Sequence, residues 1–268
     1  MNLTKSFTMA VSSIVSNKVR ALLTMLGIII GIAAVIILVS VMDGLTNEVV
    51  SVFDDMGMTS ITVNVTPRSI KQVKPEEFYE FVEENSNLLS NLSPKSIIQG
   101  ELKTDGMRSD DTITSPCNGV SESYYDIQRL KLSFGRFLGY SDVENKNKVA
   151  VIGSYQALEM YDGCEEAIGK SLKINGYPFT VIGVLEEQDN SSESGSDDVV
   201  YIPYTAALEM NGTNIVNSYV VDAKNEDVVD EAKNLVDSFI LKKMGDSNYY
   251  SVTSMKTLVD KMTEMIGN

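Results

Sequence analysis

The feature that most constrains this chain is an uncharged apolar stretch of 22 residues, from 21 to 42. As an α-helix at about 1.5 Å per residue it would be roughly 33 Å long, enough to cross the hydrocarbon core of a bilayer. No other stretch of the 268-residue sequence is comparably apolar. The sequence therefore predicts a membrane-anchored protein with one crossing and most of its mass on one side.

Basic residues indicate on which side of the membrane the N-terminus lies. Lys5, Lys18 and Arg20 precede the apolar stretch, and Asp43 follows it directly. Positive residues favour the cytoplasmic flank of a membrane helix. We therefore expect a protein of the cytoplasmic membrane whose N-terminus, flanked by Lys18 and Arg20, is cytoplasmic and whose main domain is extracytoplasmic.

The chain beyond the apolar stretch is acidic. Residues 43–268 contain 19 basic and 37 acidic residues, a formal charge of −18. Such a surface disfavours nucleic acid and anionic lipid headgroups as partners. No nucleic-acid partner is expected, and the lipid around residues 21–42 is the expected membrane partner.

A cleaved signal peptide is the alternative interpretation of this stretch. Its apolar core is about 7–15 residues long and ends at a small-x-small cleavage site. Here the stretch is longer, and the residues that follow Met42, DGLT, contain no Ala-x-Ala motif. The length favours a membrane anchor.

Residues 1–20 carry apolar side chains at helical spacing. Leu3, Phe7, Val11 and Ile14 share one face, and serine and asparagine occupy the others. This pattern is typical of an amphipathic helix at a membrane surface. We predict a cytoplasmic interfacial helix here, the alternative being a frayed start of the chain.

Two glycines lie on one face of the predicted membrane helix. Gly27 and Gly31 form a small-xxx-small pair, which lets two helix backbones approach closely in lipid. Such pairs also arise by chance in apolar helices, so a role in helix packing and a neutral role are both open.

The helical pattern continues past the membrane as a predicted stalk over residues 43–57. Apolar residues spaced 3, 4, 3 and 4 form the seam of a coiled coil, namely Met42, Leu45, Val49, Val52 and Met56. Gly57 predicts the end of this helix. The helix would stand above the membrane by something like 20 Å.

Residues 254–268 repeat the seam pattern, with Ser254 or Thr253 as the expected N-cap. The seam residues are Met255, Leu258, Met262 and Met265. The two helices would pack on each other as a stalk, or each would pack on its own domain. Because the sequence ends within the pattern, we expect a fragment that continues into another membrane helix.

Alternating and amphipathic patterns predict two β-α-β units in the external region. The expected strands cover residues 59–65, 96–102, 218–222 and 249–253, and the expected helices cover residues 75–89 and 226–241. Together they predict one porter-like α+β subdomain made of residues 58–111 and 215–253.

The intervening residues 112–214 predict a β-rich insertion. The expected strands cover residues 149–152, 171–174, 179–185 and 199–202. Asn175-Gly176 between two of them is a strong hairpin signal. Residues 188–198, QDNSSESGSDD, are expected to form a flexible, solvated acidic loop, because their spacing is not that of an EF-hand.

The composition excludes several kinds of active site. The sequence contains no His, which removes Ser-His-Asp and Cys-His catalysis and His-based metal sites. Two cysteines, Cys117 and Cys164, cannot form a zinc site alone, and a disulfide between them is left open. No catalytic residue, metal site or other cofactor is expected.

Five short motifs follow one another in the external region: GRF at 135–137, AVIG at 150–153, IGK at 168–170, VIGV at 181–184 and IP at 202–203. They come after the opening SNKVRALLTMLGIIIGIAAVI. No single motif is specific, but the ordered set resembles the MacB-type permeases of ABC transporters over essentially the whole chain.

The resemblance implies an α+β fold, with a transmembrane and stalk helix followed by a MacB-like periplasmic core. That core has a porter-like βαβ subdomain and a β-rich, Sabre-like insertion. An FtsX-like C-terminal region with three further membrane helices is absent from this sequence. The sequence also lacks the GxxxxGK[ST] motif, so nucleotide binding is expected elsewhere.

The partners that the resemblance implies are an ABC ATPase subunit, a second permease copy in a homo- or heterodimer, and an extracytoplasmic adaptor. The main hypothesis is a non-catalytic permease subunit. Mechanotransmission through its stalk would drive export or extraction of a substrate on the outer side of the membrane. The alternative is a membrane-tethered sensor or binding module without transport activity. An anchored enzyme is a third hypothesis, which the missing histidines disfavour.

Overall fold

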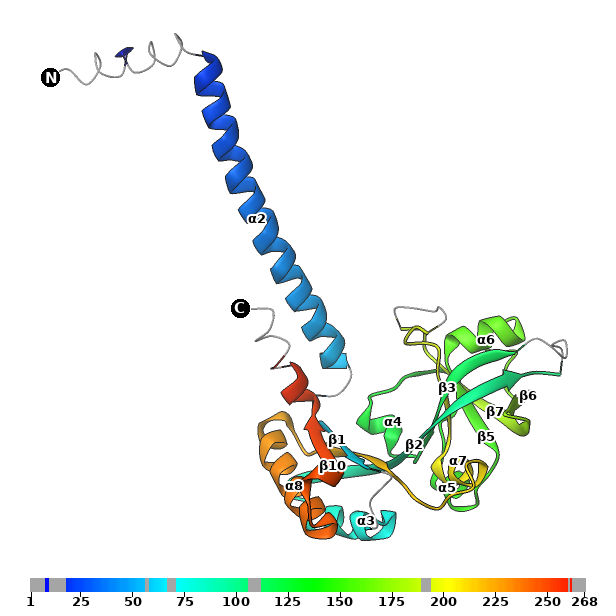
Figure 1. The fold of residues 1–268 in the computed structure, drawn as a ribbon. Coiled ribbons are helices and arrows are strands. Elements are labelled where there is room, and N and C mark those ends of the chain that lie inside the picture. Colours follow the sequence, from blue (N-terminus) through cyan, green and yellow to red (C-terminus); the bar gives the residue numbers. More distant parts are fainter. Residues whose placement is uncertain are drawn as a thin grey trace. The chain divides into compact units, whose positions relative to one another are not determined.

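The computed structural model describes residues 8–9, 18–55, 58–66, 71–105, 112–188, 194–259 and 261. The chain divides into two compact units, Met1–Val52 with Met262–Asn268, and Phe53–Lys261. Within the first unit, the described residues form helix α2 (Lys18–Asp55) and two helical residues at 8–9. The last three residues of α2 belong to the second unit. The second unit holds the strands and the other helices (Figure 1).

Helix α2 is unbroken over 38 residues, about 57 Å at 1.5 Å per residue. The predicted continuity of the membrane helix past Met42 is therefore seen in the structure. The predicted end at Met56 and Gly57 lies outside the described residues, as does most of the predicted interfacial helix at residues 1–20.

The second unit begins and ends in one antiparallel sheet with the order β10-β1-β9-β2. Its strands are β1 (Ser60–Val65), β2 (Leu89–Lys103), β9 (Ser218–Ala223) and β10 (Tyr250–Ser254). β1 lies between β10 and β9, and β9 lies between β1 and β2. The units β1-α3-β2 and β9-α8-β10 are therefore interleaved, as in split β-α-β folds.

Helices α3 (Pro75–Glu84) and α8 (Val229–Met244) contribute to the hydrophobic core of this sheet. Phe78 of α3 and Ile240 of α8 are both fully buried there. Phe81 and Phe239 stack with their ring centroids 4.0 Å apart, which joins the two helices. We call this cluster the first core.

The segment between β2 and β9 forms a small closed barrel. Its ring of pairings runs β2-β3-β8-β5-β7-β6 and returns to β2, because β6 pairs with both β7 and β2. The remaining elements are β3 (Ile113–Val120), α4 (Tyr124–Ile127), β4 (Leu132–Gly135), α5 (Tyr140–Glu144), β5 (Val149–Ile152), α6 (Ser154–Tyr161), β6 (Ser171–Ile174), β7 (Tyr177–Leu185), β8 (Val200–Pro203), α7 (Tyr204–Met210) and the 3-10 turns at Glu226–Val228 and Ser247–Tyr249. Closure removes the exposed strand edges that an open sheet of this size would have.

Strand β2 belongs to both the sheet and the barrel. Its residues as far as Lys95 pair with β9, and those from Ser96 pair with β3. At this switch the backbone N–H of Ser121 donates to Ser93 Oγ at 3.0 Å, and both serines are fully buried. A second hydrophobic cluster, which includes Leu102 and Val181, fills the barrel. A third cluster, which includes Val220 of β9 and Val151 of β5, packs between sheet and barrel.

The structure confirms the predicted α+β fold class but corrects several element boundaries. The helix predicted at 75–89 ends at Glu84, because Asn85 caps it through Nδ2, which donates to Phe81 O at 2.8 Å. The strand predicted at 96–102 begins seven residues earlier and runs through Pro94. Proline is tolerated there because, among the described residues, this half of β2 pairs with β9 on one edge, and the pairing with β3 begins at Ser96.

Three further outcomes concern the insertion. Asn175-Gly176 forms the predicted turn between β6 and β7, with φ values of 49° and 84° that fit a type I′ hairpin. The expectation of a solvated loop is wrong at its end, because Asp197 and Asp198 are each only 3 % exposed. Cys117 and Cys164 are both free, which answers the open question of a disulfide.

Candidate membrane-coupling site

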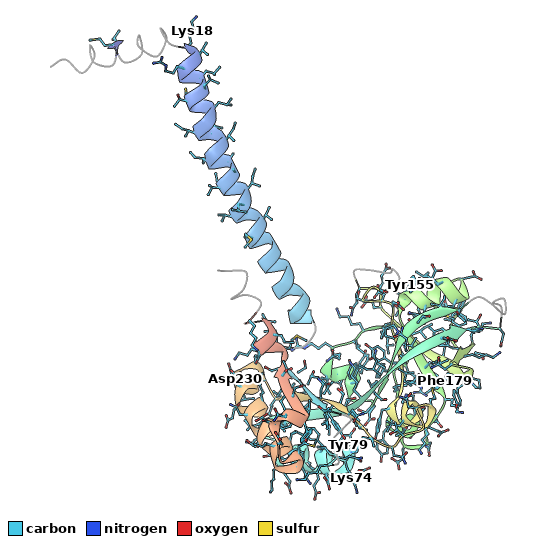
Figure 2. All side chains as sticks on the ribbon, viewed as in Figure 1. Lys18, Lys74, Tyr79, Tyr155, Phe179 and Asp230 are labelled. Carbon is cyan, nitrogen blue, oxygen red and sulfur yellow. The ribbon has the colours of Figure 1, made fainter. Side chains whose placement is uncertain are left out.

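The apolar part of α2 is uncovered among the described residues. Every side chain described from Lys18 to Met42 is exposed, including Leu26 at 49 % and Leu22 at 65 % (Figure 2). This 25-residue segment is, among the described residues, the one helix that is long and apolar enough to cross a membrane. An apolar surface of this size calls for lipid or neighbouring helices around it.

The predicted helix-packing residues lie within this segment. Gly27 and Gly31 have open space where a Cβ atom would be, with no other described atom within 4 Å. The structure thus leaves their face free for a partner helix without supplying one from the described residues, and their packing role stays a prediction. Lys18 and Arg20 form the exposed start of α2.

The membrane-proximal seam is only partly described. Leu45, Val49 and Val52 lie in α2, where the backbone is described, and Met42 is 38 % exposed. Met56 lies outside the described residues. The structure therefore supports the helical register that places these residues on one face, and their contacts stay a prediction.

The C-terminal seam starts on a capped helical turn at residues 255–259. The predicted cap is confirmed, because Ser254 Oγ accepts the backbone N–H of Thr257 at 3.1 Å. Met255 is half-buried and Leu258 is 39 % exposed. Met262 and Met265 lie outside the described residues, so the pairing of the two seams stays a prediction.

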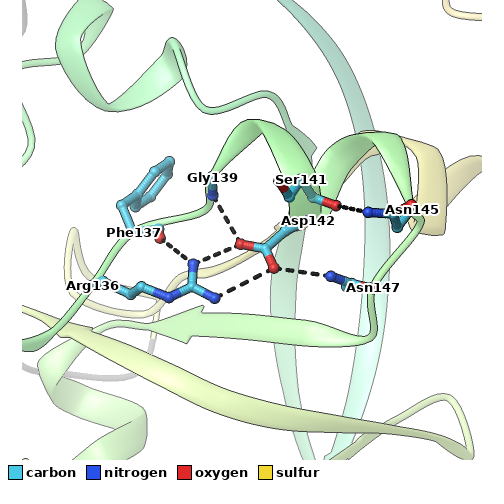
Figure 3. Close-up of polar contacts among 7 residues, drawn as sticks. All are labelled: Arg136, Phe137, Gly139, Ser141, Asp142, Asn145 and Asn147. Carbon is cyan, nitrogen blue, oxygen red and sulfur yellow. Dashed lines mark hydrogen bonds and ion pairs between the residues drawn. The ribbon is translucent and has the colours of Figure 1, made fainter.

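The GRF motif forms a polar network at the start of α5 (Figure 3). Arg136 Nη1 lies 2.6 Å from Asp142 Oδ2, and Nη1 also donates to the carbonyl oxygen of Phe137 at 3.0 Å. Asp142 further accepts the backbone N–H of Gly139 at 2.9 Å and Nδ2 of Asn147 at 3.1 Å. The buried carboxylate of Asp142 thus links Arg136 to Asn147.

The network holds Asp142 in its charged form. Burial opposes ionisation, but the hydrogen bonds from Arg136, Gly139 and Asn147 outweigh it and lower the pKa of Asp142. Sequence reasoning singled out Arg136 but missed Asp142 and Asn147. An acidic residue three positions after Gly139, at the start of a short helix, was the available sign of a cap.

Asp142→Asn is expected to lower the free energy of unfolding by about 1–3 kcal/mol at pH 7, because it weakens bonds to a buried carboxylate. The lowered pKa stabilises the fold above the unfolded value near 3.9, and this contribution is lost as pH falls through the folded pKa. When the pH is lowered from 6 to 3, the free energy of unfolding measured in urea should therefore decrease more for the native protein than for Asp142→Asn.

Asp105→Asn is the matched control for this prediction. Asp105 pairs with Lys173 at 3.0 Å, but both side chains are largely exposed. Exposed pairs contribute about 0–1 kcal/mol. An equal decrease in the free energy of unfolding for Asp142→Asn and Asp105→Asn would mean that the buried Asp142 network stabilises the fold no more than an exposed ion pair does.

Cys117 is a buried thiol. Burial, followed by the nearby charge of Asp198, raises the pKa of Cys117 to about 12, so its thiol stays protonated and unreactive. No three His, Cys, Asp or Glu side chains in the described ranges gather as metal ligands.

Comparison with solved structures first defines the class of fold. The periplasmic region of MacB from Actinobacillus actinomycetemcomitans has a TM-score of 0.58 and 23 % identity and covers 80 % of this chain and 95 % of its own. The extracellular domain of the noncanonic ABC-type transporter YknZ from Gram-positive bacteria has a TM-score of 0.58 and 17 % identity, over 73 % of this chain and all of its own. This is the fold of an α+β extracytoplasmic domain.

Sequence comparison then gives the family. Residues 21–239 match the MacB-like periplasmic core domain, and the chain belongs to that family. The macrolide export ATP-binding/permease protein MacB of Aggregatibacter actinomycetemcomitans is 29 % identical over 84 % of this chain. Its counterpart in Acinetobacter baylyi is 26 % identical over 97 %. The chain spans 35 % and 40 % of these two relatives.

Proposed function

We propose that this chain is a permease component of an ABC transporter that transmits movement across the cytoplasmic membrane. The observation that supports it best is the continuity of α2, one helix of 38 residues that leads from an apolar segment toward a MacB-like periplasmic core domain. A rigid helix transmits displacement along its axis, whereas a flexible linker would absorb it.

The proposed orientation places the N-terminus in the cytoplasm. Lys18 and Arg20 stand at the N-terminal end of α2, whose first turn has no acidic residue. Basic residues are unfavourable there for the helix dipole. A preference for the cytoplasmic side of the membrane accounts for their position better than helix stability does.

The proposed moving part is the external domain. Residues 58–111 and 215–253 would form its porter-like subdomain and residues 112–214 its insertion, with the stalk seams at 43–57 and 254–268 joining it to the membrane. Because β2 pairs in both the sheet and the barrel, a displacement of one would carry the other along. Movement of the external domain would drive the export or extraction of a substrate on the outer side of the membrane.

The proposed partners follow from this role. ATP hydrolysis would belong to a separate ABC ATPase subunit, and the chain itself would not be an enzyme. A second permease copy, identical or related, would pack on the Gly27 and Gly31 face within the lipid, and an extracytoplasmic adaptor would contact the external domain.

Purification from native membranes tests this proposal. The full-length tagged protein is expected to bring down an ABC ATPase, and Gly31→Leu is expected to reduce the yield of a second permease copy about tenfold by blocking close helix approach. Ala33→Leu, on another face of α2, is the matched control and should leave the yield unchanged. Purification without any ATPase would favour the membrane-tethered binding module instead.

A further inference from the structure

The sequence contains three Asn-Gly pairs, namely Asn118-Gly119, Asn175-Gly176 and Asn211-Gly212. An asparagine followed by glycine loses its side-chain amide readily, because no Cβ hinders the approach of the glycine nitrogen to the asparagine Cγ. In a folded protein the surrounding contacts decide whether this nitrogen can reach Cγ. The three pairs have very different surroundings.

The pair Asn118-Gly119 lies within the wall of the barrel. Both residues belong to β3, where Asn118 is paired with Ile97 of β2 and with Tyr201 of β8. Gly119 is buried, and a Cβ atom there would overlap Ala207 Cβ. The attack would require β3 to separate from both neighbouring strands, which we expect only when the barrel unfolds.

The pair Asn175-Gly176 is exposed, but hydrogen bonds hold both ends of its carboxamide. Asn175 Oδ1 accepts the backbone N–H of Glu101 at 2.8 Å, and Nδ2 donates to the carbonyl oxygen of Gln99 at 3.3 Å. The backbone N–H of Asn175 also donates to the carbonyl oxygen of Glu101 at 3.0 Å. The side chain would have to give up these bonds before Cγ could turn toward the nitrogen of Gly176.

The pair Asn211-Gly212 has neither kind of protection. It follows the end of α7 on the barrel, and both residues are exposed (Figure 1). The carboxamide of Asn211 makes no hydrogen bond to another described residue. Apart from its chain neighbours, no described atom lies within 4 Å of the Cβ position of Gly212. Nothing among the described residues therefore blocks the side chain of Asn211.

Two backbone hydrogen bonds close the turn around Asn211-Gly212. The N–H of Gly212 donates to the carbonyl oxygen of Glu209, and the N–H of Thr213 donates to that of Leu208, each at 3.1 Å. Asn211 has φ of −77° and ψ of −4°, so rotation about ψ must bring the Gly212 nitrogen to Cγ. Opening the end of a helix costs far less than global unfolding, so this rotation is accessible in the folded protein.

We propose that Asn211 is a site of spontaneous deamidation in the folded protein. A base takes the proton from the Gly212 nitrogen, which bonds to Asn211 Cγ while the Cγ–Nδ2 bond breaks. Nδ2 leaves as ammonia with a proton from water, and a cyclic succinimide remains. Water then opens the ring at Cγ to give aspartate, or at the backbone carbonyl carbon of Asn211 to give isoaspartate. One water is consumed and one ammonia released, and no group is oxidised or reduced.

Either product changes the end of α7. A new carboxylate lies beside the carbonyl groups at the C-terminal end of the helix, where negative charge is unfavourable. Isoaspartate also lengthens the main chain by one carbon within the turn closed by the N–H groups of Gly212 and Thr213. Because Ala207 of α7 belongs to the second hydrophobic cluster, we expect the modification to loosen the packing of α7 on the barrel.

Peptide mass spectrometry of the full chain tests this proposal. The protein is incubated in detergent, in water labelled with heavy oxygen, at mildly alkaline pH and physiological temperature. Asn211 is expected to convert at least about ten times faster than Asn118 and Asn175, because its reaction needs only local opening. The product should carry one labelled oxygen. In guanidinium chloride the three pairs should convert at similar rates, because each has glycine in the second position.

Asn211→Gln is the matched control. Glutamine keeps the carboxamide but would need a larger, less favourable ring, so residue 211 should show no conversion while Asn118 and Asn175 react as before. The proposal is overturned if Asn118 or Asn175 converts as fast as Asn211 in the folded protein. It is also overturned if Asn211 converts only in guanidinium chloride, because the bond from Gly212 to Glu209 would then be sufficient protection.

Discussion

A charged residue in the middle of the membrane-proximal seam is expected to uncouple ATP hydrolysis from transport. In Val49→Asp, transport should fall about tenfold or more while the partner ATPase continues to hydrolyse ATP. An unpaired carboxylate in an apolar seam costs several kcal/mol, and about 1.4 kcal/mol is enough for a tenfold change. The external domain should stay folded, because Val49 belongs to α2 and to the first compact unit.

The matched control is Asn47→Asp, which adds the same charge to the same turn of α2 on nearly the opposite face. It should leave transport within about twofold of the native rate, as expected of surface substitutions away from packed sites. The measurements are transport and ATP hydrolysis in reconstituted vesicles, with circular dichroism to check the fold. Undiminished transport in Val49→Asp would contradict the lever role of α2.

Much of the chain could be predicted because the relevant patterns are local. Helix α2 follows from hydropathy over consecutive residues, and the turn at Asn175-Gly176 follows from two residues whose backbone favours positive φ. Ser254 could be identified as a cap from its position before an apolar period. In each case the residues that determine the structure are neighbours in the sequence.

The missed elements depend on partners far away in the sequence. Strand β3 (Ile113–Val120) contains Pro116, which argues against a strand, yet it is held between β2 and β8. Barrel closure through β6 joins Leu102 to Ile174, which no local pattern reveals. The same applies to the buried polar clusters, because Asp198 accepts hydrogen bonds from Ser115 and Gln156, which lie in β3 and α6.

The second large prediction concerns Gly135, the first residue of the GRF motif. Gly135 has φ of 76°, and a Cβ atom there would overlap the carbonyl oxygen of Ile182 and lie 2.9 Å from Gly183 Cα. Both neighbours are backbone atoms of β7, which cannot rotate away. Gly135→Ala is therefore expected to lower the free energy of unfolding by about 2–5 kcal/mol, from backbone strain and overpacking together.

Gly169→Ala separates these two contributions. Gly169 has nearly the same φ, 79°, but no described atom within 4 Å of its Cβ position. Its substitution should cost only the strain of a left-handed backbone, about 1–2 kcal/mol. Urea unfolding of the two variants should therefore differ by about 1–3 kcal/mol, the cost of overpacking at Gly135. An equal decrease in the free energy of unfolding for the two variants would mean that β4 and β7 can move apart at Gly135 without cost. The close contact of Gly135 with β7 would then not contribute to stability.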